Sequence, residues 1–226
     1  MPSNRTIALL IGLIALVLLI FGIWPGIDLA VSGYFHDSTG FPMNQNVVVE
    51  FLRNQIWNGT LLMAFVAAVL LGMSYWGKTS GWFWGYILAM FVAGPGLAVN
   101  QGFKSYWGRA RPWQVTEFGG SANFSPAWQI SDQCAKNCSF VSGEGAGTTA
   151  MTIALLMILY RYRARLSPRL YRAGQTAAIA MLGFVGWQRV AVGGHFVSDV
   201  ILSMLLVSLI AALLARLMLN PDRLGR

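Results

Sequence analysis

The stretch GWQRVAVGGHFVSDV, residues 186–200, places an arginine, a histidine and an aspartate between two apolar runs. The runs on either side approach the roughly 20 residues that an α-helix needs to cross a bilayer. Ionisable side chains at membrane depth are energetically expensive, and where they occur they usually serve a function. The stretch therefore predicts two membrane helices joined by a short turn that carries functional side chains.

The composition of the chain is that of a membrane protein with several spans. Of its 226 residues, 56% are hydrophobic and 11% are charged, whereas a soluble domain carries about 25% charged residues. The formal net charge of +8 is explained by basic residues in cytoplasmic loops, so we expect membrane lipids, and no nucleic acid, as partners. We predict an all-α integral membrane protein with one domain over residues 1–226. Its expected architecture is a bundle of six transmembrane helices with a periplasmic loop and short interfacial helices.

Six apolar runs are expected to span the membrane: Thr6–Ile23, Gly59–Trp76, Trp82–Phe103, Gly145–Tyr160, Gly174–Val192 and Val197–Met218. The first run lacks a small-residue cleavage site and is longer than the apolar core of a signal peptide, so we expect it to be retained. Pro95 is expected to kink the third run. The mixed segment Pro25–Trp57 is predicted to lie along the membrane surface as a short amphipathic helix with turns.

Basic residues predict the orientation of these spans. With six spans, one side of the membrane receives these basic residues: Arg5, Lys78, Arg161, Arg163, Arg165, Arg169, Arg172, Arg216, Arg223 and Arg226. Because basic residues concentrate in cytoplasmic loops, the opposite side should be the non-cytoplasmic one, which in a bacterial inner membrane is the periplasm. That side receives the long loop Lys104–Gly143 and the turn at Gly193-Gly194.

The two cysteines agree with this orientation. Cys134 and Cys138 both lie in the loop that is predicted to be periplasmic, where disulfides persist. A Cys-x3-Cys pair could also begin a metal site, but the chain has no further cysteine and only two histidines. We therefore favour a disulfide over a metal site.

Three groups of polar residues meet at the predicted periplasmic level. They are Lys104 and Arg111, then Ser142, Gly143 and Glu144, and finally Arg189, His195 and Asp199. Guanidinium groups grip phosphate through paired hydrogen bonds, and a lysine supplies a point charge. The helix that begins at Ser142 adds free backbone N–H groups and a favourable dipole. This combination predicts a site for a phosphate ester or anhydride.

The spacing of His195 and Asp199 suggests a nucleophile. On a helix, residues four apart share a face, so the carboxylate could accept a hydrogen bond from one imidazole nitrogen. The other nitrogen would then be an unprotonated nucleophile, as in catalytic triads. The alternative is a histidine that caps a helix and an aspartate at the interface. Because three cations converge on the pair, we favour the catalytic interpretation.

The motifs Lys104-x6-Arg111-Pro112, Ser142-Gly143 and Arg189-x5-His195-x3-Asp199 resemble the three-part signature of the type 2 phosphatidic acid phosphatase superfamily. The resemblance implies six membrane helices and no metal or other cofactor. It implies that His195 attacks phosphorus and forms a phosphohistidine, which water hydrolyses, and that Asp199 orients His195. Its phosphate-binding residues would be Lys104, Arg111, Ser142, Gly143 and Arg189.

Two positions depart from that signature. Glu144 stands where the superfamily has a histidine that protonates the leaving group, and Gln188 replaces a serine before Arg189. A glutamate donates a proton only in its neutral form, which burial favours and nearby cations disfavour. Glu144 could instead orient water or bind a basic or hydroxyl group of the substrate. Gln188 is expected to hydrogen-bond phosphate in place of the serine.

Further blocks of sequence are similar to the lipid A 4'-phosphatase branch of the superfamily. They are Trp24-Pro25-Gly26-Ile27-Asp28, Gly94-Pro95-Gly96-Leu97, Trp107-Gly108-Arg109-Ala110-Arg111-Pro112 and Cys134-Ala-Lys-Asn-Cys138. That branch also tends to have an acidic residue at the position of Glu144. The similarity implies a lipid A substrate, with the 4'-phosphate favoured, and Arg109 is a possible ligand for a second phosphate.

Other functions use overlapping residues. Within the superfamily, the alternatives are a phosphatase for undecaprenyl diphosphate or phosphatidylglycerophosphate and a lipid phosphotransferase. A transporter or flippase would spread ionisable groups through the depth of the bilayer to line a route. Here these groups concentrate at one end of the predicted spans, which favours an enzyme.

Overall fold

The computed structural model describes residues 2–219, and this part of the chain is helical and contains no strand. Its α-helices are α1 (Asn4–Ile23), α2 (Gly26–Tyr34), α3 (Val47–Ser74), α4 (Gly81–Phe91), α5 (Lys104–Tyr106), α6 (Gly143–Arg161), α7 (Pro168–Ala191) and α8 (Val197–Met218). A π-helix, η2 (Val92–Phe103), joins α4 to α5, and the 3₁₀-helices are η1 (Pro42–Gln45), η3 (Pro112–Gln114), η4 (Thr116–Phe118) and η5 (Arg163–Arg165). The predicted basic residues Arg223 and Arg226 lie outside the described residues.

Four segments of residues 2–219 are long and apolar enough to cross a membrane. They are α1, α3, the continuous segment Gly81–Tyr106 and α8. Helices α6 and α7, the predicted fourth and fifth spans, are not among them, since α6 is rich in Gly, Ala and Thr and α7 carries several polar residues. The fold therefore contains membrane-spanning helices, and the count of six remains a prediction.

The second predicted span begins earlier than expected. Helix α3 starts at Val47 because Asn46 caps it, with its side-chain oxygen accepting hydrogen bonds from the backbone N–H groups of Val48 and Val49 at 3.1 Å each. Residues 47–57 therefore belong to α3, and their assignment to a surface segment was wrong. The polar residues Glu50 and Arg53 made this part of the helix resemble a surface segment, because the sequence does not show that their side chains contact α7 and α6. The expected short helix of the surface segment is α2.

The third predicted span changes helical type at its centre. Helix α4 continues directly into the π-helix η2, which contains Pro95. Proline removes a backbone donor and crowds the preceding turn, and the wider i→i+5 hydrogen-bond pattern of a π-helix is how the chain continues past it. The π-helix ends at Phe103, and Lys104 begins α5 directly after it.

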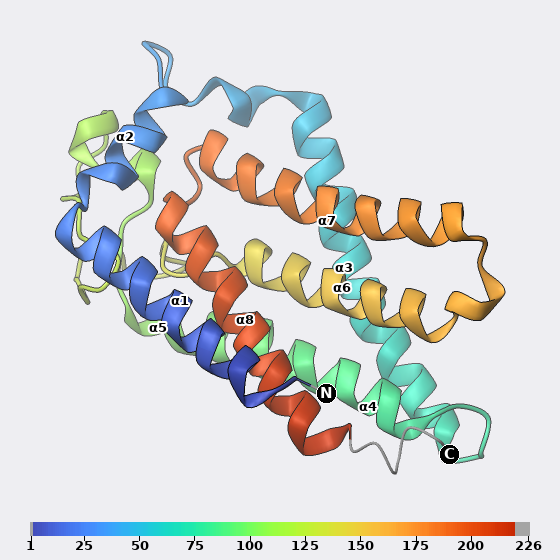
Figure 1. Cartoon of the computed structure of the whole chain (residues 1–226). Helices are drawn as coiled ribbons and strands as arrows, with labels where there is room; N and C mark the ends of the chain where they lie inside the picture. The colour runs from blue at the N-terminus through green and yellow to red at the C-terminus, as the bar shows by residue number, and fades with distance from the viewer. Residues whose placement is uncertain (1, 220–226) are drawn as a thin grey trace.

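Helix α6 is the central helix of the bundle. It packs against α7, α8, η2, α3 and α4, and Figure 1 shows it between α7 and α4. Its buried face consists mostly of small residues, among them Gly145, Ala146, Ala150 and Ala154, which let neighbouring backbones approach closely. This packing explains the modest hydropathy of α6, since a helix surrounded by protein need not be uniformly apolar.

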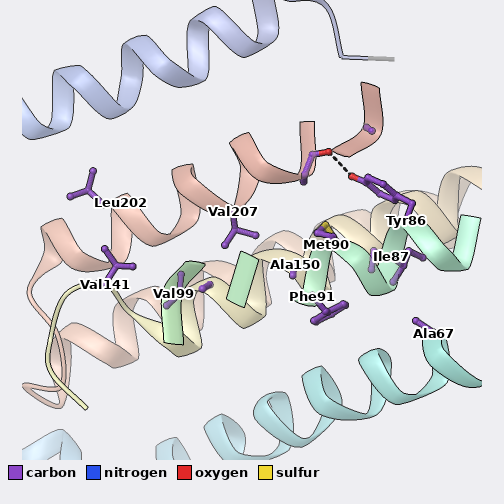
Figure 2. Close-up of a cluster of buried hydrophobic side chains, with 14 of the residues drawn as sticks. Ala67, Tyr86, Ile87, Met90, Phe91, Val99, Val141, Ala150, Leu202 and Val207 are labelled. Carbon is purple, nitrogen blue, oxygen red and sulfur yellow. Dashed lines mark hydrogen bonds between the residues drawn. The ribbon is translucent and has the colours of Figure 1, made fainter. Parts of the chain in front are cut away.

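A hydrophobic cluster fills the middle of the bundle. Figure 2 shows Met90, Val99, Ala150 and Val207 gathered between α4, η2, α6 and α8. The hydroxyl of Tyr86 donates a hydrogen bond to the carbonyl of Ala211 at 3.0 Å, which satisfies both buried polar groups. The cluster holds α6 and α8 in register, and both helices begin at the end of the molecule where α2 and the long loop lie (Figure 1).

We predict that Ala150→Leu destabilises the protein. Ala150 is fully buried, and overpacking a core position costs typically about 1–3 kcal/mol of the free energy of unfolding. Thermal unfolding in detergent measures the change. The matched control is Ala180→Leu, because Ala180 is exposed on α7. Equal unfolding midpoints for both variants would contradict the central packing of α6.

Candidate active site

A polar pocket of about 400 Å³ opens at the end of the bundle where α6 begins. It is lined by Arg53, Trp57, Asn100, Lys104, Arg111, Asn137, Gly143, Glu144, Arg189 and His195. The structure thus brings together most of the predicted site residues. The exceptions are Ser142 and Asp199, which are fully buried and do not line the pocket.

The turn between α7 and α8 places His195 beside Arg189. Gly193 ends α7 in a left-handed conformation (φ 66°), and the backbone N–H groups of Gly194 and His195 both donate to the carbonyl of Arg189 at 3.0 Å. Glycine is required at 193 because a Cβ there would overlap the ring of Phe41. The five-residue interval between Arg189 and His195 is therefore the length of one helix-terminating turn.

The imidazole of His195 presents one unprotonated nitrogen in its neutral form. Its Nδ1 lies 2.7 Å from the backbone carbonyl of Ser139. A carbonyl oxygen only accepts, so Nδ1 carries the proton and Nε2 keeps its lone pair. Burial, followed by the positive charges of Lys104, Arg111 and Arg189, lowers the pKa of His195 well below its usual range. The ring is therefore neutral at neutral pH.

The hydrogen bond expected between Asp199 and His195 is not formed, which corrects the prediction. The helical four-residue spacing does not apply, because His195 precedes α8 and Asp199 lies in its first turn. The Asp199 carboxylate instead accepts from the hydroxyl of Ser139 at 2.5 Å and from the backbone N–H of Phe196 at 3.0 Å. Asp199 thus caps α8 and reaches His195 indirectly, through Ser139.

Arg109 neutralises the buried carboxylates behind His195. Its guanidinium lies 2.6 Å from Asp199 Oδ1 and 2.8 Å from Asp28 Oδ2, and all three side chains have no exposed surface. Burial alone would lower the pKa of Arg109, but the charges of Asp199 and Asp28 raise it above its usual value. The guanidinium also covers the ring of Phe196 at 4.3 Å. The idea that Arg109 binds a second phosphate was therefore wrong.

Sequence reasoning missed the part played by Asp28. The residue lies in α2, far from the three motifs along the chain, and was noticed only as part of a similar block. It accepts hydrogen bonds from the backbone N–H and the hydroxyl of Ser198 at 3.0 and 2.6 Å as well as from Arg109. Asp28 therefore fastens α2 to the first turn of α8.

Two of the predicted phosphate ligands converge on the loop closed by the cysteines. Cys134 and Cys138 form the predicted disulfide, and the loop between them projects Asn137. Lys104 Nζ donates to the side-chain oxygen of Asn137 at 2.9 Å. Arg111 donates twice to the backbone carbonyl of Asn137, at 3.1 and 2.8 Å. Lys104 and Arg111 thus already donate hydrogen bonds to protein oxygens. The oxygens of a phosphoryl group are acceptors of the same kind.

The start of α6 forms one wall of the pocket. Ser142 caps the helix, with its Oγ accepting from the N–H of Gly145 at 3.1 Å, so this hydroxyl is engaged in the fold. A Cβ at Gly143 would lie 3.4 Å from Lys104 Cε and 3.0 Å from Asn100 Oδ1. Glycine at this position therefore allows the lysine to approach the helix N-terminus, whose first N–H groups lack intrahelical partners.

Glu144 binds two arginines through a single oxygen. Its Oε1 accepts from Arg53 at 2.6 Å and from Arg189 at 2.9 Å. Arg53 was missed by the sequence analysis, although a lone basic residue between Arg5 and Lys78 was an available signal. Gln188 is fully buried and uses its amide on Glu50 and Arg189, so the expectation that it binds phosphate was wrong.

The geometry places cationic side chains and a histidine in one polar pocket, and comparison with known proteins identifies the family. The family model of the PAP2 superfamily matches residues 82–223. The chain belongs to the PAP2 superfamily.

Three relatives that share one name accompany this match. The chain is 33% identical over 190 residues to a lipid A 4'-phosphatase of Francisella tularensis subsp. novicida (strain U112), covering 80% of this chain and 81% of that protein. It is 30% identical over 220 residues to a lipid A 4'-phosphatase of Rhizobium leguminosarum, covering 88% and 91%. A Rhizobium etli (strain ATCC 51251 / DSM 11541 / JCM 21823 / NBRC 15573 / CFN 42) protein of the same name is 32% identical over 220 residues, covering 88% and 82%. Family and relatives together support a phosphoric monoester hydrolase.

A solved structure has a similar fold. The crystal structure of a transmembrane PAP2-type phosphatidylglycerolphosphate phosphatase from Bacillus subtilis aligns with a TM-score of 0.60 over 93% of this chain and 94% of that chain. The two sequences are 21% identical, so the likeness concerns the fold alone. It agrees with an all-helical membrane protein.

We predict that Arg109→Met strongly destabilises the protein. The substitution leaves the carboxylates of Asp28 and Asp199 buried without their cation, and removing one partner of a buried ion pair costs about 3–5 kcal/mol. Denaturant unfolding in detergent micelles measures the loss. Arg169→Met is the matched control, because Arg169 is exposed at the start of α7. An unchanged unfolding midpoint for Arg109→Met would sink the structural role of this arginine.

Proposed function

We propose that this chain is a membrane lipid phosphatase that hydrolyses a phosphate monoester of lipid A, with the 4'-phosphate favoured. The reaction runs through a phosphohistidine on the periplasmic side of a bacterial inner membrane, in one domain of six spans. The observation that carries the proposal is the position of His195 in one pocket with Lys104, Arg111 and Arg189. The lipid A 4'-phosphatase relatives support the substrate.

In the first step, Nε2 of His195 attacks phosphorus. An N–P bond forms, the ester P–O bond breaks, and the electron pair goes to the leaving alcohol oxygen, which takes up the proton carried by Oε2 of a neutral Glu144. Lys104, Arg111, Arg189 and the N–H groups at the start of α6 stabilise the charge on the phosphoryl oxygens. The imidazole becomes positively charged, and the carbonyl of Ser139 at 2.7 Å stabilises that charge.

In the second step, water attacks phosphorus and passes a proton to Oε2 of Glu144, and the N–P bond breaks. Inorganic phosphate leaves, and Nε2 recovers its lone pair. Glu144 is the group proposed for proton exchange, since Oε1 is held by arginines and Oε2 has no hydrogen-bond partner among residues 2–219. Asp199 has a positioning role through Ser139, whose hydroxyl it accepts and whose carbonyl orients the imidazole.

An apolar groove next to the pocket supports a lipid substrate. The groove has a volume of about 410 Å³ and is lined by residues of α3, α4, η2 and α6, including Leu61, Phe91 and Leu97. It shares Trp57 and Asn100 with the polar pocket. A lipid whose phosphate enters the polar pocket can therefore lay an apolar chain in the groove.

Phosphate release from purified lipids tests this function. The protein in detergent is incubated separately with lipid A, phosphatidylglycerophosphate and undecaprenyl diphosphate, and the products are identified by mass spectrometry. We expect the loss of one phosphate from the 4' position of lipid A. Release from another lipid alone would reject lipid A as the substrate, and release from none would reject the phosphatase function.

We predict that His195→Ala abolishes phosphate release, by on the order of 10³-fold or more, because the nucleophile is lost. Rapid acid-free quenching with radiolabelled substrate should trap a phosphohistidine in the unchanged protein and none in the variant. The control is His36→Ala, which removes the other histidine of the chain and leaves the pocket intact. Full activity of His195→Ala would rule out the nucleophile.

We predict that the effect of Glu144→Gln depends on the leaving group. The amide oxygen can still accept from both arginines but the side chain cannot transfer a proton, so kcat for the lipid should fall on the order of 10²-fold. Activity on p-nitrophenyl phosphate should fall much less, because its leaving group needs no proton. Glu117→Gln, at an exposed site, is the control. Equal losses on both substrates would exclude proton donation by Glu144.

A further inference from the structure

Five side chains form a closed ring of hydrogen bonds beside the pocket. Arg53 Nε donates to Glu50 Oε2 at 3.0 Å, and Gln188 Nε2 donates to Glu50 Oε1 at 2.8 Å. Arg189 Nε donates to Gln188 Oε1 at 2.7 Å. Arg189 Nη1 and Arg53 Nη1 then meet on Glu144 Oε1, at 2.9 and 2.6 Å, and close the ring. The ring joins α3, α6 and α7 at the level of His195.

Two members of the ring come from outside the segment that defines the family. Glu50 and Arg53 lie in α3, whereas the PAP2 superfamily match covers residues 82–223. Neither belongs to the three sequence motifs around Lys104, Ser142 and His195. The motif residues Glu144 and Arg189 therefore depend for their contacts on a helix that no motif predicts.

The ring is partly shielded from solvent. It contains two arginines and two glutamates, and the side-chain exposures at the ion pairs are 23% for Arg53, 28% for Glu50, 19% for Glu144 and 8% for Arg189. Pairs at this depth are screened less than exposed pairs. The guanidinium of Arg53 contacts Glu50, Asn54 and Glu144 with separate nitrogens, which leaves it little rotational freedom.

Arg189 and Glu144 each keep one polar atom that makes no hydrogen bond within the ring. Arg189 commits Nε and Nη1 to the ring, and Glu144 commits Oε1. In the part of the chain that the structure describes, Arg189 Nη2 and Glu144 Oε2 have no hydrogen-bond partner. Both side chains line the pocket with His195. The free nitrogen can hold a phosphoryl oxygen while the free oxygen exchanges a proton.

We propose that Glu50 and Arg53 are positioning residues of the phosphatase reaction, which fix the carboxylate of Glu144 and the guanidinium of Arg189 relative to His195. The inference rests on the proposed function. Positioning matters because a displacement of a reacting group by about 1 Å can slow a reaction on the order of 10²-fold. Arg53 acts through Glu144, and Glu50 acts through Gln188 on Arg189.

Kinetics of Arg53 variants on the lipid substrate test this proposal. Arg53→Ala should lower kcat on the order of 10²-fold with a smaller change in KM, because it misplaces reactive groups. Arg53→Lys should recover part of the loss, since it keeps the charge beside Glu144 but lacks the fork that also reaches Glu50. Gln55→Ala, on the same helix and exposed, should retain full activity.

A double-mutant cycle separates positioning from an independent role. If Arg53 acts through Glu144, the double variant Arg53→Ala/Glu144→Gln should be no less active than Glu144→Gln alone. A loss equal to the product of the single losses would overturn the proposal, as would full activity of Arg53→Ala. If Arg53→Ala does not fold, as judged by its thermal unfolding, the same cycle is run with Arg53→Lys.

Glu50→Gln tests the other half of the ring. It removes the charge and one of the two acceptor contacts, so we expect a loss of kcat on the order of 10-fold, with the melting temperature close to that of the unchanged protein. Unchanged kinetics would overturn the role of Glu50. The unchanged protein is assayed in parallel: if it releases no phosphate from any lipid, the proposed function fails, whereas an active protein with fully active variants refutes the positioning inference alone.

Discussion

The fully buried ion pairs of Arg109 with Asp28 and Asp199 are the interaction on which the rest of the site depends. A buried charge without a partner is strongly unfavourable, so the three groups must stay together once the protein folds. Contacts among the three side chains hold α2, the long loop and the first turn of α8 against one another. Because Asp199 also accepts from Ser139, and the carbonyl of Ser139 holds His195, the orientation of the imidazole follows from this network.

The pocket in front of that network concentrates positive charge around a neutral ring. Burial and the nearby cations keep the pKa of His195 well below its usual range, so the same charges that suit a phosphate also preserve a free lone pair on Nε2. Each cation already has an oxygen partner, either Asn137 of the disulfide loop or Glu144 of α6. Protein oxygens thus hold these cationic side chains in position around the pocket where we propose that the phosphoryl group binds.

Three-dimensional structure changed the interpretation of particular residues more than it changed the fold. The span Val197–Met218 and the disulfide could be predicted because hydropathy and cysteine spacing are local properties. The start of α3 could not, since Glu50 and Arg53 are polar and their partners lie in α7 and α6, far away along the chain. Arg109 was mistaken for a phosphate ligand because its two aspartate partners are 81 and 90 residues away along the chain.

By itself, the sequence determined the helical membrane class, the motif residues and the chemistry that their side chains allow, because these follow from composition, periodicity and residue type. Only the tertiary structure decided which side-chain atoms form hydrogen bonds and ion pairs with one another. It replaced the expected contact of Asp199 with His195 by one through Ser139, and it brought Arg53 of α3 to Glu144 of α6. The physical reason is that hydrogen bonds and ion pairs depend on ångström-scale distances between residues far apart in the chain, and helix packing sets those distances.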